Sequence, residues 1–310
     1  MPQRLTQTTT ASRTTDSDPY PSLAQTILLI STKAYFTPSH TLSYLKSILD
    51  PSNGILPQLE SASPSNESPQ SLQLALLPDF LTIYPCAELL AQRSKSPEPS
   101  SWPLVLGAQQ CFWEPGPGPY TGEIVPSSLS SLGCTIVELG HAERRRYFSE
   151  TDETTARKAT AVCACGMVPL ICIGEVSAPE SNGPMSMSIG NALREIGQQV
   201  RGVLEAVPKD APIIWAYEPV WAIGAESPAE VEYVGPVVQG IRMMVDKVPG
   251  RTGETRIVYG GSAGPGLWGR GSLSDLVDGI FLGRFAHEVS AVKEVVDEVV
   301  DTMKTKKGRS

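Results

Sequence analysis

Hydrophobic positions along the chain follow two patterns that alternate. Short runs that are apolar throughout recur between longer segments whose apolar residues are spaced three and four apart. Strands that are apolar on both faces and alternate with helices form parallel sheets covered by those helices. The runs that read as strands are Thr26–Ser31, Leu72–Leu77, Leu104–Gln109, Thr135–Gly140, Val168–Ile173, Pro212–Tyr217, Arg256–Gly260 and Asp278–Gly283. Eight repeats of this unit predict an α/β protein with a closed (β/α)8 barrel.

The segments between these runs carry the helical spacing. Leu42, Leu45, Ile48 and Leu49 share one helical face, and valines and an isoleucine between residues 231 and 245 share another. Further helices are expected over Cys86–Arg93, Ser127–Leu132, Asp152–Cys165, Ile189–Leu204 and Ala286–Met303, with a short one near Ser272.

Three stretches rich in Ser, Pro and Asn interrupt the repeat. They are 51–70, 94–102 and 177–188, and we interpret them as loop insertions. Residues 1–22 are rich in Ser and Thr and predict a disordered tail; a transit peptide can share this composition, but Asp16 and Asp18 interrupt its basic character. The remaining residues, 23–310, are expected to form one barrel domain.

Composition narrows the choice of partners. Hydrophobic residues make up 41% of the chain and charged residues 19%, which is typical of a globular protein with a sizeable core. The net charge of −8 and the lack of a basic stripe argue against nucleic-acid binding. No apolar stretch approaches the roughly 20 residues of a membrane helix.

The six cysteines show no metal-type pairing and suit buried thiols in a reducing compartment, although redox or zinc roles stay open. We expect a cytoplasmic protein.

Candidate chemistry lies directly after the predicted strands. In a barrel of this kind the carboxyl ends of all strands meet at one mouth, where functional residues gather. The residues at these ends combine a carboxylate, an imidazole, a cation and turns that can offer backbone N–H groups to an anion: Glu218, His141, Lys33, Gly261, Ser262 and Gly283. Taken singly, each has an ordinary interpretation: a solvated loop glutamate, a structural histidine, a surface lysine.

Seven ordered segments resemble those of one family. They are "GAQQC", "PYTGEI", "ELGHAERRRYFSETDE", "ICIGE", "AYEPVWAIG", "RIVYGGSA" and "LVDGIFLG". Together they are similar to the triosephosphate isomerase family from about the first strand to the eighth. The resemblance implies a cofactor-independent isomerase with no metal, acting on a small phosphorylated sugar.

The resemblance also implies roles for particular residues. Glu218 resembles the base that moves a proton between adjacent carbons, and His141 the neutral acid that polarises the carbonyl. Lys33 would stabilise the enediolate, with Glu143 as a further carboxylate of the site. The substrate and its phosphate would be held by Ser31, Gly224, Gly261, Ser262, Gly283 and Arg284. Residues 219–227 resemble a lid, and Tyr120 and Thr121 resemble the tip of a loop that reaches into a second subunit, implying a homodimer.

Several positions depart from the family pattern. Ser31 and Gln110 stand where the family has asparagine, and Ala142 stands where it has serine. The far end of the lid reads "AES", and Arg284 replaces a glycine. The Arg284 side chain either points away, leaving its N–H in place, or adds a guanidinium to the anion site. A run of three arginines, 144–146, indicates structural ion pairs or a dimer contact more than an anion patch.

Three functions follow from this reading. The first is interconversion of D-glyceraldehyde 3-phosphate and dihydroxyacetone phosphate through an enediolate. The second is the same chemistry on another short sugar phosphate, such as a tetrulose phosphate, which an altered lid and phosphate shell could accommodate. The third is a barrel without catalysis that binds a partner as a scaffold.

Overall fold

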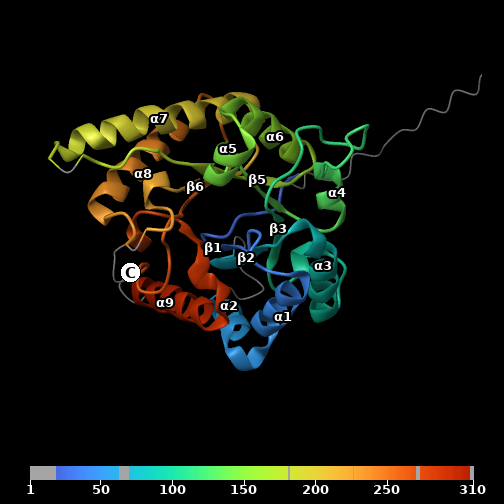
Figure 1. Cartoon of the computed structure of the whole chain (residues 1–310). Helices are drawn as coiled ribbons and strands as arrows, with labels where there is room; N and C mark the ends of the chain where they lie inside the picture. Colours follow the sequence, from blue (N-terminus) through green and yellow to red (C-terminus); the bar gives the residue numbers. More distant parts are fainter. Residues whose placement is uncertain (1–18, 63–69, 181, 226, 270–272, 308–310) are drawn as a thin grey trace, which may run out of the picture.

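Eight parallel strands close into a barrel surrounded by helices (Figure 1). The computed structural model describes residues 19–62, 70–180, 182–225, 227–269 and 273–307. Each strand pairs with the next along the chain, and β1 pairs with β8. The strands are β1 (Thr26–Ser31), β2 (Leu72–Leu77), β3 (Val105–Ala108), β4 (Ile136–Leu139), β5 (Val168–Ile173), β6 (Ile213–Tyr217), β7 (Thr255–Tyr259) and β8 (Gly279–Leu282). The predicted barrel is confirmed, and every strand end lies within one residue of its predicted position.

Alternate side chains of each strand face opposite sides of the barrel wall. Ile27 and Leu29 of β1 pack in the cluster that fills the barrel, whereas Leu28 and Ile30 pack in the outer layer against the helices. In β4 the inward position is Ile136, and Val137 and Leu139 face outward. The same alternation points Ser31, Glu138 and Glu218 into the barrel interior.

The helices lie outside the strands and supply the outer layer of the core. They are α1 (Pro38–Leu49), α2 (Ile55–Ala62), α3 (Phe80–Ser94), α4 (Pro126–Ser131), α5 (Ala142–Phe148), α6 (Asp152–Ala164), α7 (Met185–Ala206), α8 (Val231–Asp246) and α9 (Val289–Lys307). Local capping begins several of them: the side chains of Thr37, Asp79 and Thr151 accept backbone N–H groups in the first turns of α1, α3 and α6.

Two expected insertions are partly helical. Residues 51–70 were predicted as a surface loop, but Pro51–Asn53 form a 3-10 turn and α2 follows, burying Ile55, Leu56 and Leu59. The prediction was wrong because three apolar side chains on one helical face outweigh the flanking Ser and Pro residues. Similarly, α7 begins inside the stretch predicted as loop 177–188.

Some predictions concern residues outside the described ranges. These are residues 1–18 of the expected tail, residues 63–69 of the first insertion, Glu226 of the lid, and Ser272. Next to Ser272, Leu273–Asp275 form a 3-10 turn between β7 and β8. Helix α3 begins six residues before its expected start, because the Asp79 cap lies upstream of the apolar pattern.

Candidate active site

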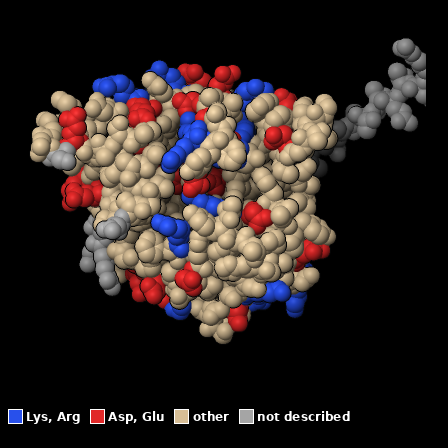
Figure 2. Space-filling view, in the orientation of Figure 1, with Lys and Arg blue, Asp and Glu red and all other residues tan. Residues whose placement is uncertain are grey.

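The strand ends converge on one face, as barrel geometry requires. Figure 2 shows acidic and basic surface side by side near the middle of this face. Lys33 follows β1, His141 follows β4 and Glu218 follows β6. Ion-pair distances link Lys33 to Glu143, Glu143 to His141 and His141 to Glu218, so the structure brings the four residues predicted for the catalytic set into one cluster.

Glu218 turns its side chain into this cluster. Its backbone N–H donates to the Ile173 carbonyl at 2.8 Å, which extends the pairing of β5 and β6 by one residue. A Cβ atom on Gly260 would lie 2.4 Å from Glu218 Cγ, so glycine at position 260 leaves the space that the glutamate occupies. Glu218 is 7% exposed, and its Oε2 atom has no hydrogen-bond partner within the described ranges. The carboxylate is a buried acceptor with one oxygen available.

The backbone N–H of Glu143 sets the orientation and the tautomer of the His141 ring. His141 caps α5, and its Nδ1 atom accepts the backbone N–H of Glu143 at 3.1 Å. A ring nitrogen that accepts a hydrogen bond carries no proton, so the proton of the neutral ring lies on Nε2. That Nε2 atom is 3.6 Å from Glu218 Oε2. A proton donor and a proton acceptor therefore face the same small space.

Lys33 reaches the cluster from a strained turn. Its φ of 48° lies in the left-handed region, which a lysine adopts only when its surroundings hold it there. Its Nζ atom lies 2.7 Å from Glu143 Oε1. Burial alone would lower the pKa of Lys33, but Glu143, and more weakly Glu218 and Glu138, raise it overall. For Glu143 the reverse holds: burial would raise its pKa, and Lys33 brings it below its usual range.

Gln109, which was predicted only as the end of the third strand, holds this turn in place. Its side-chain N–H groups donate to the carbonyls of Leu77 and Lys33 and to the Thr32 hydroxyl at 3.0–3.2 Å. One amide thus ties the ends of β1, β2 and β3 together. This amide therefore supports the strained backbone conformation of Lys33.

Glu138 is the site residue that sequence reasoning missed. It lies on the inward face of β4 and is 3% exposed, and Ser31 on β1 is 4% exposed. Burial raises the pKa of Glu138 to about 7, with His141, Lys33 and the Ser31 hydroxyl acting in the opposite direction. The Ser31 hydroxyl is near enough to affect that pKa, yet neither Ser31 Oγ nor Glu138 Oε2 completes a well-aligned hydrogen bond. The available signal was a glutamate inside the apolar run "TIVELG".

The turns after β7 and β8 meet beside the lid. Gly261 has a φ of 120°, which favours glycine, and a Cβ atom on Gly283 would lie 3.4 Å from the Gly261 carbonyl oxygen. Ser262 was expected to offer its N–H to a phosphate; its hydroxyl binds the lid stem, donating to Ala225 O at 2.7 Å and Ala222 O at 3.1 Å. Both predicted phosphate turns thus border the same loop.

Arg284 lies toward the lid. It begins a 3-10 turn, Arg284–His287, without a positive φ, so this position does not require glycine. A Cβ atom on Gly224 would lie 3.7 Å from an Arg284 guanidinium nitrogen. No carboxylate in the described ranges forms an ion pair with Arg284. Of the two outcomes expected for this arginine, the structure shows the guanidinium beside the lid glycine rather than directed away from it.

Glu175 connects the lid stem to the barrel. Its Oε1 atom accepts from Trp221 Nε1 at 2.8 Å and from the hydroxyl of Tyr233 on α8 at 2.9 Å, with Tyr217 of β6 at 3.4 Å. Trp221 lies in the 3-10 turn Val220–Ala222 directly after Pro219. Burial raises the pKa of Glu175 although these hydrogen bonds lower it. The segment "ICIGE" therefore anchors the loop that follows Glu218.

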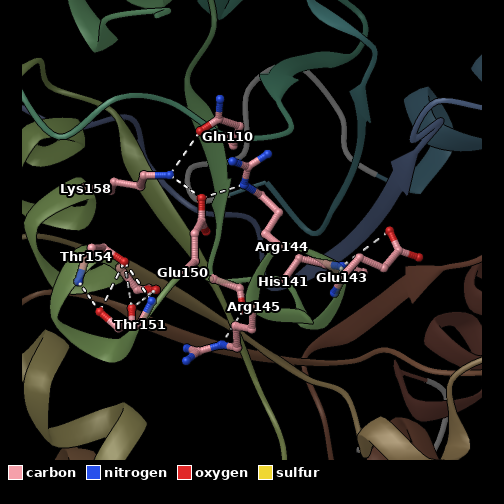
Figure 3. A network of polar contacts seen from close by, with 11 residues as sticks. Gln110, His141, Glu143, Arg144, Arg145, Glu150, Thr151, Thr154 and Lys158 are labelled. Carbon is pink, nitrogen blue, oxygen red and sulfur yellow. Dashed lines mark hydrogen bonds and ion pairs between the residues drawn. The ribbon is translucent and has the colours of Figure 1, made fainter. Parts of the chain in front are cut away.

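Two departures from the family pattern lie in different environments. Gln110 accepts from Lys158 Nζ at 3.0 Å, in a network where Glu150 binds Lys158 and Arg144, to one side of the catalytic cluster (Figure 3). Ala142, by contrast, lines a small cavity of about 20 Å³ together with Glu218. Gln110 therefore binds Lys158 of α6 in an ion-pair network, and Ala142 leaves space beside the Glu218 carboxylate.

The arginine run and the predicted dimer loop lie around this centre. Arg144 pairs with Glu150, and Arg145 pairs with Asp152 at 2.5 Å, which confirms the structural ion pairs. Tyr120 packs on Phe112 with ring centroids 4.8 Å apart in the loop between β3 and α4, and Thr121 is exposed. The structure does not bring these two residues into the catalytic cluster.

The cysteines are unpaired, and all except the half-buried Cys165 are buried, in keeping with packing roles. Within the described ranges, no three His, Cys, Asp or Glu side chains are grouped to hold a metal ion. The helices described here include none that is long and apolar enough to cross a membrane.

A closed barrel with a carboxylate and an imidazole facing each other at its mouth is the architecture of the barrel isomerases. The family model described as triosephosphate isomerase matches residues 45–299. The chain belongs to the triosephosphate isomerase family.

Named relatives within this family differ in substrate. An L-erythrulose-1-phosphate isomerase of Pectobacterium atrosepticum is 36% identical over 87% of this chain and 93% of its own length. A second protein of that name, from Rhizobium meliloti, is 36% identical over 74% of this chain and 84% of its length. A triosephosphate isomerase of Dictyoglomus thermophilum is 33% identical over 77% of this chain and 85% of its length.

Proposed function

We propose that the protein is an isomerase of a four-carbon ketose phosphate, with L-erythrulose 1-phosphate as its substrate. The observation that carries this proposal is the facing pair of Glu218 Oε2 and His141 Nε2, 3.6 Å apart and buried. A base and a neutral N–H donor at that separation can act on neighbouring carbon and oxygen atoms of one substrate.

The chemistry of the substrate defines the reaction. L-erythrulose 1-phosphate has its carbonyl at C2 and its phosphate on C1, so a carbonyl cannot form at C1 while the phosphate remains there. Glu218 would take the proton from C3 while His141 donates from Nε2 to the C2 oxygen, giving a C2–C3 enediolate that Lys33 stabilises. Return of the proton from Glu218 to C2, while the C3 hydroxyl gives its proton to His141, moves the carbonyl to C3 and restores both side chains. The product is a tetrulose with its phosphate on the carbon farther from the carbonyl, so this reaction converts one ketose to another.

Three side chains support a substrate larger than a triose phosphate. Ser31 and Ala142 are smaller than the asparagine and serine of the family pattern, and Ala142 borders the small cavity of about 20 Å³ beside Glu218. Arg284 places its guanidinium, which forms no ion pair among the described residues, near Gly224, where it can bind a phosphate in two hydrogen bonds. The names of the Pectobacterium and Rhizobium relatives agree with this substrate.

Triose phosphate isomerisation is the second candidate. Dihydroxyacetone phosphate has the same arrangement of phosphate and carbonyl and lacks only the terminal hydroxymethyl group, and the Dictyoglomus relative carries the corresponding name. The intact set of Glu218, His141 and Lys33 argues against a non-catalytic scaffold, since strain at Lys33 is maintained only where the fold supports it.

Proton exchange measured by nuclear magnetic resonance tests the proposal. The purified protein is incubated in D2O with L-erythrulose 1-phosphate or with dihydroxyacetone phosphate, and deuterium at the carbons next to the carbonyl is followed with product. We expect kcat/KM to be higher for the tetrulose, and Glu218→Gln to reduce it by roughly a thousandfold, within the range for loss of a general base. Turnover of the triose alone would replace the first candidate by the second, and no exchange with either sugar would leave the scaffold.

We also propose that the protein is a homodimer in which the loop bearing Tyr120 and Thr121 contacts the second subunit. The exposure of Thr121 and the neighbouring half-buried Tyr120 supports this placement. Light scattering gives the mass directly: a particle of one chain mass, 33.2 kDa, would refute it.

A further inference from the structure

Two buried polar groups inside the barrel, Glu138 and Ser31, take no part in the proposed proton transfer. Glu138 projects inward from β4 three residues before His141, and Ser31 projects inward from β1 two residues before Lys33. They come from separate walls of the barrel and both face its interior, and the Ser31 hydroxyl, His141, Glu218 and Lys33 are close enough to shift the pKa of the Glu138 carboxyl. The pair therefore lies inside the barrel, earlier on its strands than the residues at the mouth.

Both groups leave hydrogen-bonding capacity unused. Glu138 is 3% exposed and Ser31 is 4% exposed, and the atoms Glu138 Oε2 and Ser31 Oγ have no partner among the described residues. Buried polar atoms are nearly always paired, and a buried carboxyl without a partner is unfavourable. An apolar residue at position 138 would match the rest of the run "TIVELG". The unused atoms therefore point to a polar group that is supplied from outside the chain.

The barrel order shows which part of a substrate reaches Glu138. The turns proposed to hold the phosphate follow β7 and β8, and β4 lies four strands from β8 in the closed order of eight. A sugar phosphate anchored at these turns extends across the mouth toward β4. In L-erythrulose 1-phosphate the group farthest from the phosphate is the hydroxymethyl on C3, the carbon that loses its proton to Glu218. Dihydroxyacetone phosphate has a hydrogen atom in place of this hydroxymethyl group.

We propose that Ser31 and Glu138 form a hydroxyl-binding subsite inside the barrel, which receives the terminal hydroxymethyl group of a four-carbon ketose phosphate. This inference rests on the proposed function and adds the residues that select the longer sugar. A hydroxyl both donates and accepts, so it can satisfy a carboxyl oxygen and a serine hydroxyl together. A site with buried polar groups of this kind discriminates against an analogue that leaves them unpaired.

A substrate analogue without that hydroxyl tests the subsite directly. The compound is 4-deoxy-L-erythrulose 1-phosphate, which keeps the phosphate, the carbonyl and the exchangeable proton and ends in a methyl group. We expect wild-type kcat/KM to be higher for L-erythrulose 1-phosphate than for the analogue by about tenfold to a hundredfold, the range for loss of a hydrogen bond to a charged group. In Glu138→Val and Ser31→Ala the preference should shrink to about threefold or less.

Matched variants separate the subsite from a general effect on the barrel. Ile136→Val alters the same strand on the same inward face, one layer deeper, and should keep the wild-type preference. Ser31→Ala removes only one hydroxyl, so it serves if Glu138→Val does not fold. A preference that stays at its wild-type value in Ser31→Ala and any folded Glu138 variant would overturn the subsite while leaving the proposed function intact, and would indicate that these atoms hold a structural water. Absence of wild-type turnover of L-erythrulose 1-phosphate would overturn both.

Discussion

The buried carboxyl of Glu138 makes the stability of this protein depend on pH in a specific direction. Its pKa is raised from 4.5 to about 7 in the folded chain by burial, with Glu218 adding to the effect and His141, Lys33 and Ser31 opposing it. Below pH 4.5 the group is protonated in both the folded and the unfolded chain. Between pH 4.5 and about 7 the folded chain keeps the proton that the unfolded chain has lost, so the free energy of unfolding falls as pH rises.

The magnitude follows from those two values. Each pH unit between them corresponds to about 1.4 kcal/mol, so ionised Glu138 lowers the free energy of unfolding by about 3 kcal/mol above pH 7. Glutamine has nearly the same shape and never ionises. We therefore expect Glu138→Gln to have about the stability of the wild type near pH 5 and to exceed it by as much as about 3 kcal/mol near pH 8.

Urea denaturation of both proteins at several values between about pH 5 and pH 8 measures this difference. Other titrating groups are common to both proteins and largely cancel when the two unfolding free energies are subtracted. Ile136→Val, which loses one buried methyl group on the same strand, should differ from the wild type by an amount that does not change with pH. A Glu138→Gln difference that is constant across the range, or that grows toward acid pH, would refute the reasoning.

Three further predictions concern the surroundings of the site. Gly260→Ala places a Cβ atom 2.4 Å from Glu218 Cγ, so kcat should fall by about a hundredfold or more. The circular dichroism spectrum should remain that of a folded protein. A retained kcat would show that the Glu218 carboxylate can move aside. Arg284→Ala should raise KM about tenfold with a smaller change in kcat, because it removes a charged donor to the phosphate. The control Arg146→Ala removes an arginine that lies over the Tyr147 ring and should leave KM unchanged. Equal effects of the two substitutions on KM would place Arg284 outside the site. Trp221→Phe removes the indole N–H, one of three donors to Glu175, and should increase proteolytic cleavage within the lid. Unchanged cleavage rates would show that this hydrogen bond does not hold the loop.

Periodicity was sufficient to identify the barrel because each strand is apolar on both faces. Segments such as Val168–Ile173 contain little but branched aliphatic residues, and no helical spacing competes there. Residues 51–70 show the limit of this reasoning: Ile55, Leu56 and Leu59 become a helical face only where neighbouring elements cover them. Turn composition alone cannot show whether such a surface is available.

For the site, strand ends and family resemblance led to Glu218, His141, Lys33 and Glu143, and the structure brings these four together. Neither indicated Glu138, because its importance depends on Ser31, which is more than a hundred residues away along the chain. The contacts of Gln109 with three strand ends were hidden for the same reason.

The sequence by itself therefore determined the closed barrel, the family and the residues at its mouth, since alternation and local motifs are properties of short segments. Only the tertiary structure decided the tautomer of His141, the direction of the Arg284 guanidinium and the burial of Ser31 and Glu138, whose Oγ and Oε2 atoms have no hydrogen-bond partner among the described residues. Each of these depends on distances and burial between atoms from separate strands and loops, and closure of the barrel is what sets those distances.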